Sequence, residues 1–93
     1  MMELLERRFR PAPRVLHQEV HGEAVLLDLA SERYFGLNQV GARIWALCSQ
    51  GQTQGAVLEA LEAEFEVGRE QLEADLARLL SQLLEAGLLV EAS

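Results

Sequence analysis

The sequence lacks any apolar run of about 20 residues, the length needed to cross a bilayer as a helix. Near its start it also lacks the apolar segment of about 7–15 residues that a secretory signal peptide requires. Cysteine occurs once, at Cys48, so no disulfide can form within the chain. These absences predict a cytoplasmic protein with no membrane partner.

Basic residues are scarce in the second half of the chain. Residues 51–93 contain two Arg and nine acidic residues, whereas residues 1–50 contain six of each, and Lys is absent throughout. A surface that binds phosphate needs clustered Lys or Arg. The charge distribution therefore predicts that nucleic acid is not a partner.

No arrangement typical of catalysis or metal binding is present. The serines have no Gly-x-Ser-x-Gly context, and the glycines are scattered rather than gathered in a phosphate loop. Cys48 falls on the apolar side of an expected helix beside Ile44, as a small buried hydrophobe would. His17 and His21 belong to an expected strand and its turn, without a third ligand nearby. We therefore expect no enzyme activity, no cofactor and no metal.

The chain is long enough for one domain, and hydrophobic residues make up 49% of it. Pro11 and Pro13 disfavour regular structure near the start. We therefore expect residues 1–14 to form a flexible N-terminal tail and residues 15–93 to form the folded domain.

Three short strands are expected first, over residues 15–20, 23–29 and 32–37. The first two are joined by a tight turn at His21–Gly22, and Ala30–Ser31 marks the next turn. Strands joined by such short turns pair antiparallel, so we expect a three-stranded meander.

Three helices are expected to follow. Asn38 can cap the first, which Gly51 ends, and Thr53 can cap the second. The third is expected over residues 69–86, ending at Gly87. A three-stranded antiparallel sheet followed by three helices predicts an α+β, winged-helix-like domain. Residues 88–90 can add a short strand or simply pack on the core.

The leucines of the third helix form an unusually wide apolar arc. At 100° per residue they span about 140°, against a minimum of roughly 100° for a helix that faces a core. Such an arc fits a helix packed between two others, or a helix that also lines a groove for a partner. The helix has a net charge of −2, which disfavours contact with DNA.

The stretches "VLLDLASERYFGLNQVGARIWALCSQGQT", "LEAEFEV" and "EADLARLLSQLLEAGLLV" together resemble the PqqD-like proteins. These are the recognition elements of pathways that make ribosomally synthesised and modified peptides. The "RYFGLN" strand is most similar to the free-standing leader-binding proteins of lasso-peptide biosynthesis. The resemblance covers about residues 15–90.

The resemblance implies a non-catalytic protein that binds the leader segment of a precursor peptide and presents it to a separate leader protease and a cyclase. The leader would add as a strand to the third strand and lie against the third helix. The contact residues it implies are Arg33, Tyr34, Phe35, Gly36, Leu37, Leu72, Asp75, Leu76, Leu79 and Leu83. A winged-helix transcription regulator, or a recognition protein of another pathway such as that of pyrroloquinoline quinone, remains an alternative.

Within this set, core and groove residues are expected to differ. We assign Phe35 and Leu37 mainly to the core, together with Ile44 and Trp45 of the first helix. Tyr34 and Leu76 are expected at the groove, because a tyrosine hydroxyl tolerates a wet rim.

Overall fold

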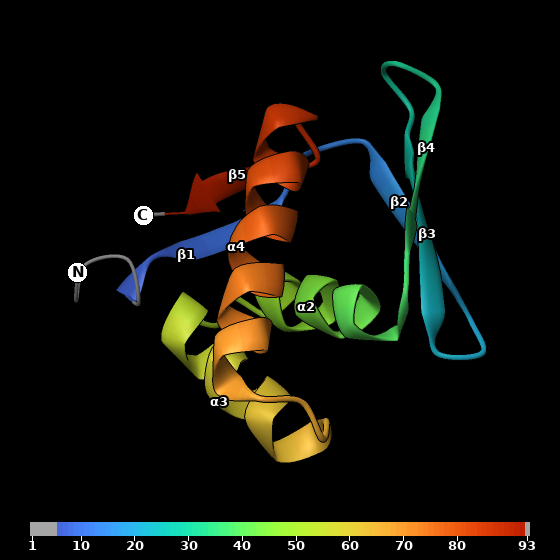
Figure 1. Ribbon diagram of the computed structural model, residues 1–93. Helices are drawn as coiled ribbons and strands as arrows, with labels where there is room; N and C mark the ends of the chain where they lie inside the picture. Colours follow the sequence, from blue (N-terminus) through green and yellow to red (C-terminus); the bar gives the residue numbers. More distant parts are fainter. Residues whose placement is uncertain (1–5, 93) are drawn as a thin grey trace.

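The structure, a computed structural model, describes residues 6–92. It confirms an α+β arrangement in which a three-stranded antiparallel sheet precedes three helices (Figure 1). The elements are β1 (Arg8–Pro11), β2 (Val15–Val20), β3 (Glu23–Asp28), β4 (Arg33–Leu37), α2 (Gln39–Ser49), α3 (Gln54–Glu64), α4 (Arg69–Glu85) and β5 (Leu89–Ala92).

Strands β2, β3 and β4 form the expected meander, with β3 in the centre. The turn between β2 and β3 consists of His21 and Gly22, both with positive φ (54° and 82°), as a tight two-residue hairpin requires. Along β3, Ala24 and Leu26 are buried against the helices, while Val25 points to the opposite side. The sheet therefore has one face packed on the core and one face turned to solvent.

A second, two-stranded sheet joins the two ends of the described chain. Strand β1 pairs antiparallel with β5, and Phe9 of β1 is fully buried in the core. The expectation of an irregular tail over residues 1–14 is therefore wrong for Arg8–Pro11, and its residues 1–5 lie outside the described residues. Pro11 is tolerated because it ends a strand in a sheet of only two strands. Of the two alternatives for residues 88–90, the strand is the one that forms.

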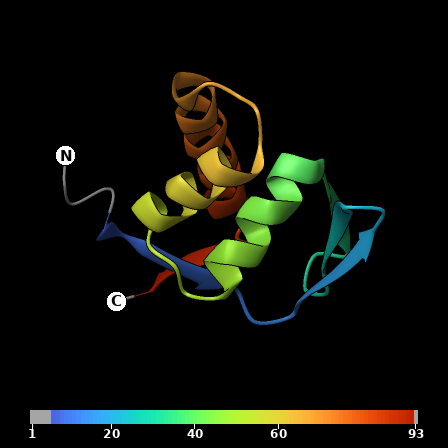
Figure 2. The ribbon, with the colours of Figure 1, turned by 90° about the horizontal axis from the view of Figure 1, so that it is seen from below.

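The helices begin at the capping residues expected from the sequence. Thr53 Oγ1 accepts a hydrogen bond from the Ala56 amide (3.1 Å), and Asn38 caps α2 in the same way. Helix α2 is central, because it contacts both sheets and both other helices (Figure 2). Its buried residues include Ile44 and Trp45, as expected. No helix within residues 6–92 is long and apolar enough to span a membrane.

Candidate functional site

Strand β4 is an edge strand that runs beside α4. It pairs only with β3, from Arg33 opposite Asp28 to Leu37 opposite Ala24. In the part of the chain that the structure describes, no strand pairs with its other side. An uncovered edge presents a row of backbone N–H and C=O groups that can pair with another chain.

The side chains of β4 alternate between the two faces of the sheet. Leu37 is buried and Phe35 is half-buried, and both lie on the side facing the helices. Tyr34 and Gly36 lie on the opposite side, and Tyr34 is 73% exposed. This confirms that Phe35 and Leu37 share one face and that Tyr34 takes the other.

The turn from β4 into α2 is unusually tight. Asn38 Oδ1 accepts a hydrogen bond from the Gly41 amide at 2.8 Å, which starts the helix immediately after the strand. A Cβ atom at Gly41 would lie 3.3 Å from Asn38 Oδ1 and 3.4 Å from Leu37 Cβ. Glycine at this position therefore lets α2 begin directly against the end of β4.

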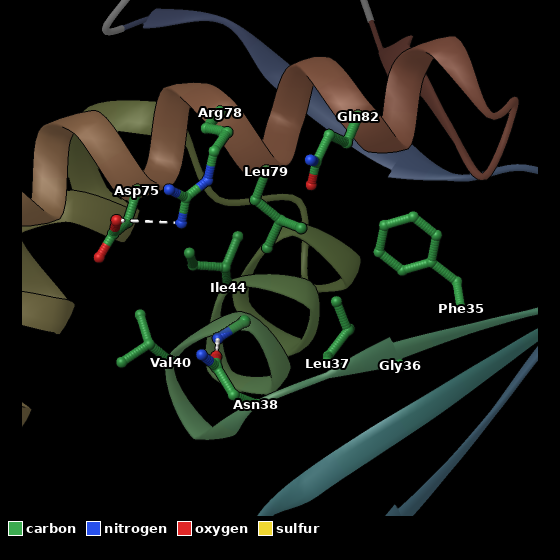
Figure 3. A pocket seen from close by; sticks show the side chains of 11 residues that line it. Phe35, Gly36, Leu37, Asn38, Val40, Ile44, Asp75, Arg78, Leu79 and Gln82 are labelled. Atoms are coloured by element: carbon green, nitrogen blue, oxygen red, sulfur yellow. Dashed lines mark hydrogen bonds and ion pairs between the residues drawn. The ribbon is translucent and has the colours of Figure 1, made fainter.

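A pocket of about 270 Å³ lies between this junction and α4 (Figure 3). Strand β4 and the start of α2 supply an apolar side that includes Phe35, Leu37 and Ile44. Helix α4 supplies the opposite side. Its lining residues are Asp75, Arg78, Leu79 and Gln82. The pocket thus combines apolar contacts with groups that can form hydrogen bonds, as ligand-binding pockets commonly do.

Asp75 is held in place within α4. Its Oδ1 accepts hydrogen bonds from Gln71 Nε2 (2.9 Å) and from an Arg78 guanidinium nitrogen (3.2 Å). The Asp75 side chain is 23% exposed and that of Arg78 is 68% exposed. An exposed pair of this kind adds little to stability. Both groups can therefore form hydrogen bonds with a bound molecule at small energetic cost to the fold.

A second pocket, of about 530 Å³, continues along β4 past Phe35, which lines both pockets. It lies between Arg33 and Tyr34 on the strand and Glu85 near the end of α4. We call the two pockets together the β4–α4 groove. Its length follows the whole of β4.

The loop that leads into this end of β4 is ordered by Asp28. The Asp28 carboxylate accepts hydrogen bonds from the Ala30 amide (3.0 Å) and the Ser31 hydroxyl (2.9 Å). Glu32 adopts a positive φ of 60°, and its amide donates to the Asp28 carbonyl at 2.7 Å. These bonds determine where β4 begins beside α4.

Seven of the ten predicted contact residues line the groove, and three do not. Those that border the groove are Arg33, Tyr34, Phe35, Gly36, Leu37, Asp75 and Leu79. Tyr34 and Gly36 border it from the rim, because both belong to the opposite face of the sheet. Leu72, Leu76 and Leu83 are instead buried in the core, each with at most 2% of its surface exposed. The placement of Leu76 at the groove is therefore corrected.

Helical geometry explains the difference. Taking Leu72 as 0°, Leu83 falls at about 20° and Leu76 at about 40°, in the middle of the apolar arc that faces the core. Leu79 falls at about 340°, at one edge of the arc. Sequence reasoning missed Arg78 and Gln82 because on this helix it considered only the leucines and Asp75. Asp75, Gln82 and Arg78 fall at about 300°, 280° and 240°, the strip next to Leu79.

Cys48 takes no part in the groove. It is buried in the core, as expected, and this burial raises the pKa of its thiol to about 11. The thiolate is the reactive form of cysteine, so Cys48 is inert at neutral pH.

Comparison with known proteins decides the family. The model of the family described as "Coenzyme PQQ synthesis protein D (PqqD)" matches residues 23–89. The chain belongs to the PqqD family. Two solved structures of similar proteins contain leader peptides, whereas no curated protein matches the sequence.

The first of these structures is TbiB1 in complex with the TbiA(beta) leader peptide. It is 36% identical in sequence, with a TM-score of 0.79, and the match covers 86% of this chain and 93% of TbiB1. The second is a lasso peptide synthetase B1 complexed with the leader peptide. It is 32% identical, with a TM-score of 0.79, and the match covers 89% of this chain and 98% of the other. This PqqD-family chain therefore shares its fold over nearly the whole length of both proteins.

Proposed function

We propose that this protein binds the leader segment of a ribosomal precursor peptide in the β4–α4 groove. The observation that carries the proposal is the uncovered edge of β4 alongside a pocket lined by α4. The two similar solved structures, each with a leader peptide, support the same ligand class. The leader adds to the sheet as a strand next to β4.

Strand addition divides the recognition between backbone and side chains. Each backbone hydrogen bond to β4 contributes roughly 0.5–1.5 kcal/mol and sets the register of the peptide without depending on its sequence. Alternate side chains of the leader then point toward α4. Leu79 offers them an apolar contact, and Asp75 and Arg78 offer opposite charges. Specificity comes from this second set of contacts.

We propose further that the protein is a non-catalytic subunit of lasso-peptide biosynthesis in the cytoplasm. It presents the leader to a separate leader-cleaving protease and to a cyclase. The likeness to a lasso peptide synthetase B1 supports this pathway. The described residues contain no group of three or more His, Cys, Asp or Glu side chains placed to hold a metal ion.

The experiment that tests the binding mode uses a set of leader peptides, each N-methylated at one position. N-methylation removes one backbone donor and leaves the side chains unchanged. In strand addition only alternate peptide amides face β4, so we expect methylation to weaken binding at every second position. Uniform tolerance of methylation along the leader would contradict strand addition.

Hydrogen exchange provides the matching measurement on the protein. Amides in residues 33–37 are expected to exchange more slowly when the leader is bound. Protection confined to α3, Gln54–Glu64, would place the peptide elsewhere.

The precursor leader of a pyrroloquinoline quinone pathway serves as the comparison ligand, and tighter binding of that leader would assign the chain to that pathway instead.

A further inference from the structure

The second pocket of the β4–α4 groove combines apolar surface with charge. It has a volume of about 530 Å³ and lies between the start of β4 and the end of α4. Its apolar lining includes Phe35 and Leu88, and its charged lining residues are Asp28, Arg33 and Glu85. The shape and lining suit a side chain that is apolar along its length and polar at its tip.

Backbone hydrogen bonds hold both sides of this pocket. The Leu88 carbonyl, just after α4, accepts a hydrogen bond from the Ala12 amide at 2.9 Å. The Leu29 amide, just after β3, donates to the Arg14 carbonyl at 2.9 Å. Both bonds are made by the short segment that joins β1 to β2. This segment therefore ties the end of α4 to the end of β3, and the pocket is formed before any ligand arrives.

Glu85 differs from the other carboxylates of the groove in its partners. Asp75 forms an ion pair with Arg78 at 3.2 Å. Asp28 lies directly opposite Arg33 on the neighbouring strand, where opposite charges stabilise each other. Within residues 6–92, Glu85 takes part in no ion pair. The groove therefore has an unbalanced negative charge at the end formed by Glu85.

The fold itself does not explain an acid at this position. Glu85 is the final residue of α4, and the last turn of this helix contains no basic residue. The C-terminal end of a helix has a partial negative charge, so an acidic side chain there lowers stability. With Leu72 at 0°, Glu85 falls at about 220°, next to Arg78 at about 240° on the strip that lines the groove. Glu85 thus adds charge to the groove at a cost to the helix.

We propose that the second pocket binds a cationic side chain of the leader, Lys or Arg. This inference rests on the proposed function. The methylene stem of the cation packs along Phe35 and Leu88, and its charged tip reaches the Glu85 carboxylate and the last carbonyl groups of α4. An acidic leader side chain would be repelled by both groups. An apolar one would cover Glu85 without pairing it, which carries a desolvation cost.

Strand geometry predicts where this cation lies in the leader. Side chains of an added strand face α4 at every second position, beside Arg33, Phe35 or Leu37. Phe35 lines both pockets and lies at the Gln82 end of the first one (Figure 3). The cation therefore lies two or four residues along the leader from the side chain that contacts Leu79.

The test titrates fluorescent leader peptides in which each position in turn is replaced by Lys or by Glu. The proteins are wild type, Glu85→Gln and Glu85→Lys. Glu70→Gln is the matched control, because Glu70 is an exposed acid in the first turn of the same helix and lies outside both pockets of the groove. Glu85 is also exposed, so neither substitution there threatens folding.

We expect one position at which the Lys peptide binds wild type about fivefold or more tightly than the Glu peptide. Glu85→Gln should reduce this preference to about twofold or less. Glu85→Lys should reverse it, and Glu70→Gln should leave it unchanged. Leu79→Ala should remove the effect of truncating a leader side chain two or four residues away.

Leader binding without a preference for Lys at any position would overturn the subsite, as would a preference that survives Glu85→Gln. A preference for Glu that Arg33→Gln abolishes would also overturn it, because the pocket would then hold an acidic side chain. Failure of the proposed function is separately visible. In that case the wild-type chain binds none of the leader peptides, and the subsite is overturned with it.

Discussion

Three leucines on α4 allow core and groove to be separated by measurement. Leu76 is buried in the core, with 2% of its surface exposed. Leu79 and Leu84 are both half-buried and both pack against the core. They lie at opposite edges of the apolar arc, and only Leu79 lines the β4–α4 groove. Leu84 is therefore a control with the same side chain, on the same helix, that is also partly buried.

The expected effects on stability follow from burial. Leu76→Ala leaves a cavity, so it should lower the free energy of unfolding by about 2–5 kcal/mol. Leu79→Ala and Leu84→Ala should each lower it by about 1 kcal/mol, because these sites are already partly open to solvent. For a domain of this size, 1 kcal/mol shifts the melting temperature by roughly 4–8 °C. Leu76→Ala should thus melt at least about 8 °C below wild type.

For leader binding, the largest effect is expected at Leu79 rather than at Leu76. An anchor in a peptide-binding pocket contributes about 2 kcal/mol, so Leu79→Ala should raise the Kd for the leader by about 30-fold. Leu84→Ala should leave the Kd unchanged. Leu76→Ala should also leave it nearly unchanged at temperatures where the variant is folded.

The assay combines thermal unfolding without peptide and a fluorescence anisotropy titration with labelled leader, for each variant. Equal leader affinity of Leu79→Ala and Leu84→Ala would refute the assignment of the groove. A melting temperature of Leu76→Ala close to that of Leu84→Ala would refute the assignment of the core.

Four further predictions concern the core, the thiol and the excluded functions. Trp45→Ala should lower the free energy of unfolding, measured by chemical denaturation, by about 3–5 kcal/mol. Trp45→Phe should lower it clearly less, because the buried indole N–H has no hydrogen-bond partner in the described structure. Equal losses for the two variants would contradict this. Cys48 of the folded protein should react with a thiol reagent only as the pH approaches 11, so rapid labelling at pH 8 without denaturant would count against its burial. Incubated alone with the precursor, the protein should leave the intact mass of the peptide unchanged, whereas a cleaved or dehydrated product would reveal an enzyme. No gel shift of duplex DNA is expected at micromolar protein and physiological salt, since α4 has a net charge of −2; a salt-sensitive shift would favour a regulator.

The elements between β2 and α4 could be predicted because their signals are local. Asn38 and Thr53 are side chains that accept the first amides of a helix, and both act as caps in the structure. His21–Gly22 tolerates the positive φ of a tight turn, and the strands on each side pair around it. The sequence boundaries of β3 and β4 differ from the observed ones by a single residue.

Strand β1 could not be predicted because its partner is remote. It pairs with β5 at the other end of the chain, and the bidentate ion pair between Arg7 and Glu91 (2.7 Å for the shorter contact) joins the same two segments. No pattern within residues 1–14 specifies such a contact, and two prolines argue against a strand. The burial of Phe9 is a consequence of this pairing.

The amino-acid sequence by itself determined the order of the elements from β2 to α4, their caps and turns, and the apolar arc on α4, since each depends on residues a few positions apart. Only the tertiary structure decided how that arc is used. Helix α4 packs with its centre on the core, so Leu76 is covered while Leu79, Asp75 and Arg78 face β4. The period of a helix specifies which residues share a face, but the neighbours that cover that face come from distant parts of the chain.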